Sequence, residues 1–353
     1  MRATDNTSLK PGWAKIALFG GSAVTAAGAA ALGVLIGQAE FARRTIPLAE
    51  APPPRADGIY RAKNGGGGTN GTRSTIKPVQ LALLGDSSAA GLGVHRARQT
   101  PGAMIATGLS RRLQQPVQLH NLAVVGSTSD RLVYQVEEAL DLHPDIAVIL
   151  IGANDVTHRS GQAAAVRHLA DAVRRLRGAG AQVVVGTCPD LGAVQPIRPP
   201  LRWLARAWSR QLAAAQTVAV VEAGGWTVSL GSLLGPTFAA QPHRMFSFDR
   251  YHPSAEGYAL AASVLLPTVV AAMRAPIARQ EAAEQGVDGV RSLPQAAFEA
   301  ARHAGTEVSG VRVAGRERGP AGRWAQLRRR VWEAVRPHEV ASTASTLETQ
   351  EQT

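Results

Sequence analysis

The sequence predicts an α/β domain in which a parallel β-sheet is covered by helices on both faces. Between Val79 and Met273, short runs rich in valine, leucine and isoleucine alternate with longer stretches of helical periodicity. Runs of this kind are typical of strands buried on both faces of a sheet, and the helical stretches connect one parallel strand to the next. Polar clusters lie at the ends of such runs, and open α/β sheets bind their ligands at the carboxyl ends of the strands.

Each element is expected from its own pattern. The strands are expected at residues 79–84, 117–122, 146–151 and 182–185, with the short apolar run 218–221 as a fifth. The helices between them are expected at about 101–114, 129–140, 162–178 and 201–215, and a closing helix at 255–273. The resulting domain covers residues 78–274.

The chain begins with a polar segment, residues 1–15, and an uncharged segment, residues 16–39, follows it. The uncharged segment is long enough to cross a membrane as a helix, with Trp13 at the interface. A secretory signal cleaved near Ala39, after Gly37-Gln38-Ala39, is the alternative. The first interpretation makes the chain a single-pass membrane protein with the domain at residues 78–274 outside the cytoplasm, and the second makes it secreted.

The remaining flanks carry no visible chemistry. Residues 40–77 are expected to be a linker, because Pro52-Pro53-Pro54 is stiff and the run 65–68 is all glycine. Residues 275–353 are expected to be a weakly ordered basic tail. Within it, residues 323–336 form an amphipathic pattern that fits either an anionic membrane surface or the body of the domain.

Composition excludes several classes of protein. The chain has 353 residues with 38 basic and 26 acidic ones, a net charge of +12, and one cysteine, Cys188. One cysteine excludes a disulfide framework within the chain and a zinc site built from several cysteines. The histidines show no spacing typical of metal ligands, so neither a metal nor a cofactor is expected. The basic balance fits a membrane surface, nucleic acid or genomic bias, and no nucleic-acid motif accompanies it.

Four polar clusters carry the chemistry. Gly85-Asp86-Ser87-Ser88 follows the first expected strand, Gly126 lies beyond the second, and Gly152-Ala153-Asn154-Asp155 follows the third. Asp249 and His252, three residues apart, precede the closing helix. A serine hydroxyl becomes an effective nucleophile when an imidazole takes its proton and a carboxylate orients that imidazole. The N–H groups of Ser87 and Gly126 and the amide of Asn154 are candidate oxyanion donors.

These four clusters, in this order, resemble the SGNH (GDSL-type) hydrolase family over about residues 78–273. The resemblance implies a flavodoxin-like three-layer sandwich with five parallel strands, and a hydrolase acting on esters or thioesters. It also implies Ser87 as nucleophile, His252 as general base and Asp249 as its orienter, with Ser87, Gly126 and Asn154 as the oxyanion hole. A leucine often follows the serine in this family, whereas Ser88-Ala89 follows here, which bears on the shape of the substrate.

The expected helix 201–215 is a candidate for substrate binding. Trp203 or Trp208 is expected to line an acyl groove, and Arg206 and Arg210 to meet an anionic substrate or lipid head group. The alternative is a helix packed on the core with a solvated basic side.

The leading functional prediction is an exported or membrane-tethered serine esterase that acts on a lipid or cell-envelope ester. A lysophospholipase, a thioesterase or a carbohydrate O-deacetylase would use the same three residues and differ in pocket shape. A non-catalytic envelope-binding module is the alternative from another class, and the intact set of four clusters argues against it.

Overall fold

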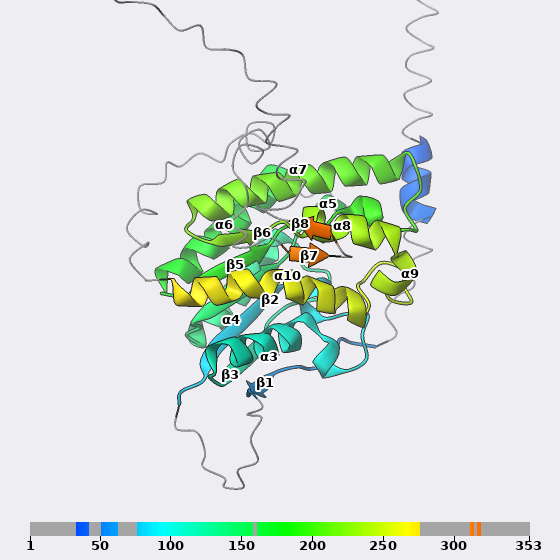
Figure 1. Ribbon diagram of the computed structural model, residues 1–353. Helices are drawn as coiled ribbons and strands as arrows, with labels where there is room; N and C mark the ends of the chain where they lie inside the picture. Colours follow the sequence, from blue (N-terminus) through cyan, green and yellow to red (C-terminus); the bar gives the residue numbers. More distant parts are fainter. Residues whose placement is uncertain are drawn as a thin grey trace, which may run out of the picture.

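The computed structural model describes residues 33–41, 51–62, 76–157, 161–275, 311–313 and 316–318. At its centre is a six-stranded sheet in the order β1-β3-β2-β4-β5-β6 (Figure 1). The strands are β1 (Gly58–Tyr60), β2 (Val79–Gly85), β3 (Val117–Asn121), β4 (Ile146–Leu150), β5 (Gln182–Gly186) and β6 (Trp226–Val228). The last five are parallel to one another, as expected, and β1 adds an antiparallel edge beside β3.

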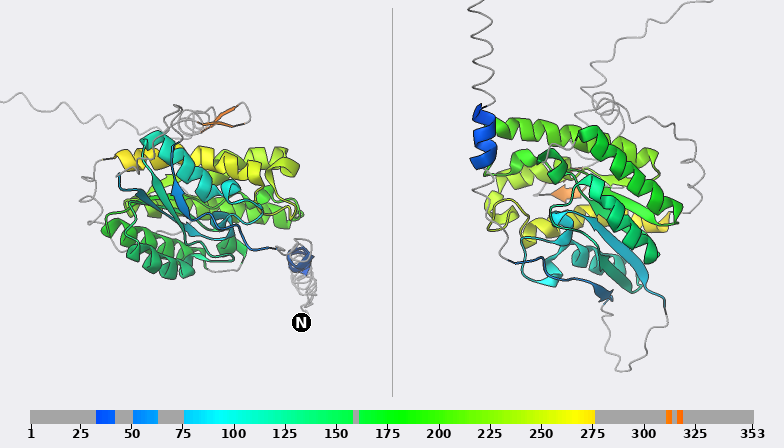
Figure 2. Two further views of the ribbon diagram at one scale, coloured as in Figure 1. Left: turned by 90° about the horizontal axis from the view of Figure 1, so that it is seen from below. Right: turned by 180° about the vertical axis from the view of Figure 1, so that it is seen from behind.

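Helices cover both faces of this sheet, so the molecule has three layers (Figure 2). On one face lie α3 (Pro101–Leu113), α8 (Leu230–Ala240) and α10 (Ala255–Arg274), and on the other lie α4 (Leu132–Asp141), α6 (Gln162–Gly178) and α7 (Leu201–Glu222). Successive residues of β2 divide between the two cores: Leu83 faces the first group of helices and Leu84 the second. This alternation explains why the central strands are apolar at every position.

The expected fifth strand was placed wrongly. Residues 218–221 lie inside α7, and the fifth parallel strand is β6. An apolar run of that length fits the end of a buried helix as well as it fits a strand. Here nothing between 201 and 222 breaks the helix, and the chain turns only at Gly224, whose φ of 78° favours glycine.

Two other elements were not expected. The segment predicted to be a linker contains β1, whose Gly58 pairs with Leu119 of β3. Helix α8 follows β6 directly, and its apolar residues Leu233, Leu234 and Phe238 are buried. Three short helices, α2 (Ser87–Ala90), α5 (Ala153–Thr157) and α9 (Pro242–Met245), complete the domain.

The flanking segments are described only in part. Residues 33–41 form a helix, whereas the rest of the expected anchor and the expected amphipathic helix at 323–336 lie outside the described residues. In the tail, β7 (Val311–Val313) and β8 (Arg316–Arg318) form an antiparallel pair. Within the part of the chain that the structure describes, one helix, α10, is long and apolar enough to cross a membrane, and 56% of that stretch is buried in the domain. Its apolar composition is therefore explained by its packing in the core of the domain.

Candidate active site

A sharp turn at the end of β2 presents Ser87 at the carboxyl edge of the sheet. Gly85 has a φ of 134°, and a side chain on it would overlap the carbonyl oxygen of Leu150, so only glycine fits this position. The Asp86 side chain caps α2 by accepting the N–H of Ser88 at 2.9 Å. Ser87 is therefore held in the first turn of α2, with its backbone N–H at the start of the helix.

The loop before α10 brings Asp249 and His252 to this serine. With Nδ1 protonated, the His252 ring donates to Asp249 Oδ2 at 2.6 Å, and His252 Nε2 accepts the hydroxyl of Ser87 at 2.8 Å. Asp249 Oδ1 accepts two backbone N–H groups, from Tyr251 and His252, both at 2.9 Å. The three side chains thus form one continuous chain of hydrogen bonds, in the order that proton transfer from a serine requires.

The same loop is fastened on both sides. Within the loop, the N–H of Ser247 donates a hydrogen bond to the carbonyl of His252 at 2.8 Å. The Ser247 hydroxyl then donates to the carbonyl of Gly93 at 2.7 Å, which ties the loop to the segment after α2. The Tyr251 ring meets the His252 ring edge to face at 4.9 Å between centroids. These contacts restrict the imidazole to one orientation.

The pKa values of the two carboxyl groups near Ser87 are shifted in opposite directions. Burial acts to raise the pKa of Asp249, but the hydrogen bonds from the His252 ring and from backbone N–H groups outweigh it, and the pKa is lowered. Asp86 is 2% exposed, and burial raises its pKa to about 6 although the Ser88 N–H and nearby His252 act to lower it. Asp249 therefore stays ionised as a partner for His252, whereas Asp86 takes up a proton in weak acid.

Besides Ser87, the candidate oxyanion donors lie in the loop after β3 and in the first turn of α5. Gly126, in the loop after β3, is exposed and has a φ of 80°. Asn154, in the first turn of α5, donates from Nδ2 to the carbonyl of Ser127 at 2.9 Å. That bond ties the Asn154 amide to the residue next to Gly126, so the two candidate donors belong to one hydrogen-bonded unit.

A buried polar network supports this unit, and most of its residues were not predicted from the sequence. Asp155 accepts both the N–H of Ser129, at 2.9 Å, and its hydroxyl, at 2.8 Å. Gln135 of α4 bridges the end of β2 to the same loop: it bonds the N–H and the carbonyl of Gly85 and donates to the Ser127 hydroxyl at 3.1 Å. A buried glutamine in an otherwise apolar helix face was the available signal.

An apolar cavity of about 100 Å³ adjoins the candidate site. It touches Asp86 and Ser88, on either side of Ser87, and Tyr251 and Pro253, on either side of His252. Its remaining walls come from the ends of β4 and β5, the segments that follow these two strands, helices α8 and α10, and Phe246 just after α9. The larger aliphatic and phenylalanine side chains among them are Leu150, Ile151, Leu191, Val194, Leu230, Leu234, Phe238 and Phe246.

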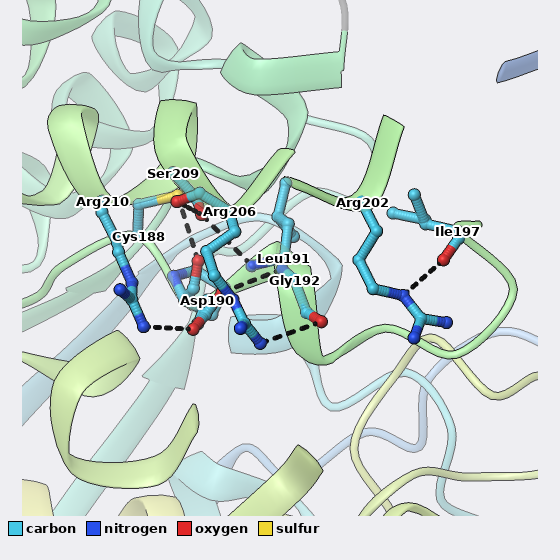
Figure 3. A network of polar contacts seen from close by, with 10 residues as sticks. Cys188, Asp190, Leu191, Gly192, Ile197, Arg202, Arg206, Ser209 and Arg210 are labelled. Atoms are coloured by element: carbon cyan, nitrogen blue, oxygen red, sulfur yellow. Dashed lines mark hydrogen bonds and ion pairs between the residues drawn. The ribbon is translucent and has the colours of Figure 1, made fainter. Parts of the chain in front are cut away.

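The aromatic and basic residues of α7 that were expected to bind substrate do not line this cavity. Trp203 and Trp208 are 66% and 42% exposed, and neither lines this cavity. Arg206 and Arg210 both pair with Asp190, at 3.4 and 3.2 Å (Figure 3).

Asp190 itself is buried at the cavity wall and also caps the turn after β5, accepting the N–H of Gly192 at 2.9 Å. The two arginines therefore neutralise a buried carboxylate, and the cavity next to the candidate site is lined by α8 and not by Trp203 or Trp208.

No cluster of three or more histidine, cysteine, aspartate or glutamate side chains suited to a metal ion occurs in the described ranges. Cys188 is 1% exposed, and burial raises the pKa of its thiol well above the usual range. A protonated thiol in this position is a packing residue and not a nucleophile.

The chain is similar to proteins that are already known. The family model for GDSL-like lipases and acylhydrolases matches residues 83–260. A GDSL-like esterase of Mycobacterium tuberculosis is 48% identical over 255 residues, which cover 71% of this chain and 81% of that protein.

Solved structures are also similar. The crystal structure of TesA matches with a TM-score of 0.42 and 21% identity, over 55% of this chain and 98% of that one. A lipase/acylhydrolase from Enterococcus faecalis matches with a TM-score of 0.41 and 21% identity, over 55% of this chain and 96% of that one.

Proposed function

The chain belongs to the GDSL-like lipase/acylhydrolase family and is an ester-hydrolysing enzyme, and from that premise we propose that it cleaves carboxylic esters through Ser87, His252 and Asp249. The observation that carries this proposal is the unbroken series of hydrogen bonds from the Ser87 hydroxyl through the imidazole to the Asp249 carboxylate.

In the proposed reaction, Ser87 Oγ attacks the ester carbonyl carbon while His252 Nε2 takes the hydroxyl proton. The tetrahedral intermediate collapses, the C–O bond to the alcohol breaks, and His252 returns the proton to the leaving alcohol. Water then attacks the acyl-enzyme with His252 again as base, which releases the carboxylic acid and restores Ser87. The N–H groups of Ser87 and Gly126 and the Asn154 amide would stabilise the oxyanion, each contributing about 3 kcal/mol.

The cavity is the proposed site for the acyl group. The residues on either side of Ser87 and of His252 line this cavity, and its walls are mainly apolar. A volume of about 100 Å³ is less than that of an engineered apolar cavity known to hold benzene, about 150 Å³. Its size therefore favours a short acyl group.

We further propose that residues 16–39 anchor the chain in the cell membrane with the catalytic domain outside the cytoplasm. The absence of any Asp, Glu, Lys or Arg in that segment supports an anchor. Such a location favours an ester carried by a lipid or by the cell envelope. If the segment is instead cleaved near Ala39, the domain is secreted.

Labelling with a fluorophosphonate probe tests the proposal directly. The full chain should be labelled and should hydrolyse p-nitrophenyl esters, whereas Ser87→Ala and His252→Ala should do neither. Ser88→Ala, which removes the neighbouring hydroxyl, should remain labelled. A folded wild-type chain that neither reacts nor turns over any ester would favour a non-catalytic binding module.

A further inference from the structure

The helix formed by residues 33–41 is docked against the start of α7. Gln38 bonds the backbone there through both ends of its amide: Nε2 donates to the carbonyl of Pro199 at 2.7 Å, and Oε1 accepts the N–H of Leu201 at 3.1 Å. The Arg198 guanidinium lies over the Phe41 ring, 4.8 Å from its centroid. A two-ended amide contact with a cation–π contact beside it fixes an orientation as well as a position.

This docking contact is at the same edge of the sheet as the candidate active site. Residues 187–200 follow β5, Ser87 follows β2 and Asn154 follows β4, and these strands are parallel. Figure 1 shows the helix, in blue, at the same end of the molecule as α9, and the loop of Asp249 and His252 follows α9 in the sequence. The helix is thus bound to the edge of the sheet that carries the candidate active site.

The docked helix continues the proposed anchor. The uncharged segment 16–39 ends next to Gln38, and Glu40 is the first charged residue after it. As a helix, that segment would be about 36 Å long at 1.5 Å per residue, whereas the hydrocarbon core is about 30 Å thick. Its last turn, which holds Gln38, would therefore emerge into the headgroup region and bring Pro199 and Leu201 with it.

The side chains at this edge suit a headgroup region. Trp203, in the first turn of α7, is 66% exposed, and tryptophan is favoured at membrane interfaces. Val125 and Phe248, which adjoin Gly126 and Asp249, are exposed apolar residues on the loops around the candidate site. Arg198, beside the docking contact, is exposed and basic, and each basic residue near an anionic leaflet contributes about 1 kcal/mol.

We propose that the helix 33–41 locks the catalytic domain to its membrane anchor with the active-site edge against the lipid headgroups. The ester substrate would then be an amphiphile of that same membrane, presented to Ser87 from the bilayer surface. The choice of substrate rests on the proposed esterase activity. The orientation rests on the proposed anchor and does not depend on that activity.

Spin labels test the orientation without catalysis. A label at Trp203→Cys would be compared with one at Arg111→Cys, an exposed residue near the end of α3, at the opposite edge of the sheet. The native Cys188 is 1% exposed, so the label should react only with the introduced cysteine. With the full chain in vesicles of phosphatidylcholine and phosphatidylglycerol, the label at 203 should collide more with lipid-dissolved oxygen than with a water-soluble nickel chelate. Equal accessibility of the two positions would overturn the proposal.

A pair of substrates tests the consequence for catalysis. One is p-nitrophenyl butyrate in solution, and the other is a butyryl ester of a fluorogenic phenol whose alkyl chain holds it in the vesicle. Gln38→Ala should lower the ratio of bilayer to soluble turnover about fivefold or more. Without the docking contact, the domain no longer holds its active site toward the bilayer, and the effective concentration of the membrane-held ester at Ser87 falls. Gln211→Ala, the same change on the exposed side of α7, should leave the ratio unchanged.

An unchanged ratio in Gln38→Ala would show that docking does not direct the domain to the bilayer. If the wild type instead cleaves neither butyryl ester, the proposed function fails, while the spin-label result still decides the orientation.

Discussion

The carboxylate of Asp249 divides its two oxygens between the His252 ring and the backbone. Oδ2 lies 2.6 Å from Nδ1 of His252, and Oδ1 accepts the N–H groups of Tyr251 and His252. The backbone bonds fix which oxygen faces the imidazole. Asp249 therefore sets both the orientation and the tautomer of the ring.

Asp249→Asn should lower kcat for ester hydrolysis about 10⁴-fold. Because Oδ1 must keep accepting the two backbone N–H groups, the new amide would turn its NH₂ toward Nδ1 of His252 and make that atom an acceptor. Nε2 would then carry the proton and could not accept the one on Ser87. Steady-state kinetics with a thermal unfolding control checks this, and a variant within tenfold of wild type would show that Asp249 does not orient the ring.

Asp86→Asn should stabilise the protein at neutral and basic pH. The folded-state pKa of Asp86, about 6, is higher than the ordinary value of 3.8, so the folded state holds a proton that the unfolded state has released. Stability from this group is therefore fully present below pH 3.8 and is lost as pH rises through 6. The gain in the variant should grow from less than about 1 kcal/mol at pH 4 to about 3 kcal/mol at pH 8.

Urea unfolding at both pH values measures this difference. Asn keeps the oxygen that caps Ser88, whereas Asp86→Ala loses that cap at a cost of about 1 kcal/mol and serves as the comparison. A gain that does not change with pH would mean that Asp86 is not protonated in the folded protein.

The proximity of Ser87, His252 and Asp249 could be predicted from the sequence, because these residues lie at fixed points of a repeating pattern. The end of a strand before Ser87 and the spacing of Asp249 and His252 are local features, and the parallel strands bring them to one edge. The strands β2 to β5 were predictable for the same reason, since each is a continuous apolar run between helical stretches.

The rest depends on contacts between distant segments. The run 218–221 has the composition of a strand, and only the absence of a helix breaker before Gly224 decides otherwise. The pairing of Arg206 and Arg210 with Asp190 joins the loop after β5 to α7, and no spacing within the sequence indicates it. The cavity walls come from α8 and five other segments, so the proposed acyl site could not be located before the fold was known.

Replacing Arg206 and Arg210 together with alanine should affect neutral and anionic esters equally. The double change leaves the buried Asp190 carboxylate without its ion-pair partners, at a cost of about 1–3 kcal/mol, and loosens the cavity wall. Arg202→Ala is the matched control, because Arg202 donates to the carbonyls of Ile197 and Gln195 and not to a carboxylate (Figure 3). A selective loss of kcat/KM for anionic esters would instead assign these arginines to the substrate.

Two changes at Leu234 should move the preferred acyl length in opposite directions. Leu234 lies on α8 and lines the cavity, so Leu234→Trp should fill it and Leu234→Ala should enlarge it. Each methylene that gains or loses a place in the cavity changes the transition-state free energy by about 0.8 kcal/mol, or about fourfold in kcat/KM. The ratio of octanoyl to acetyl turnover should fall in the first variant and rise in the second.

The controls separate specificity from stability. Leu234→Ala removes a buried side chain at a cost of about 2–5 kcal/mol, so kcat/KM must be measured well below the unfolding temperature of each variant. Trp208→Ala, on α7 and outside the cavity, should leave the acyl preference unchanged. Because filling and enlarging a cavity both destabilise the fold, a loss of stability alone would shift all chain lengths together. Opposite shifts in acyl length can arise only if the acyl group occupies the cavity, and parallel shifts would mean that it binds elsewhere.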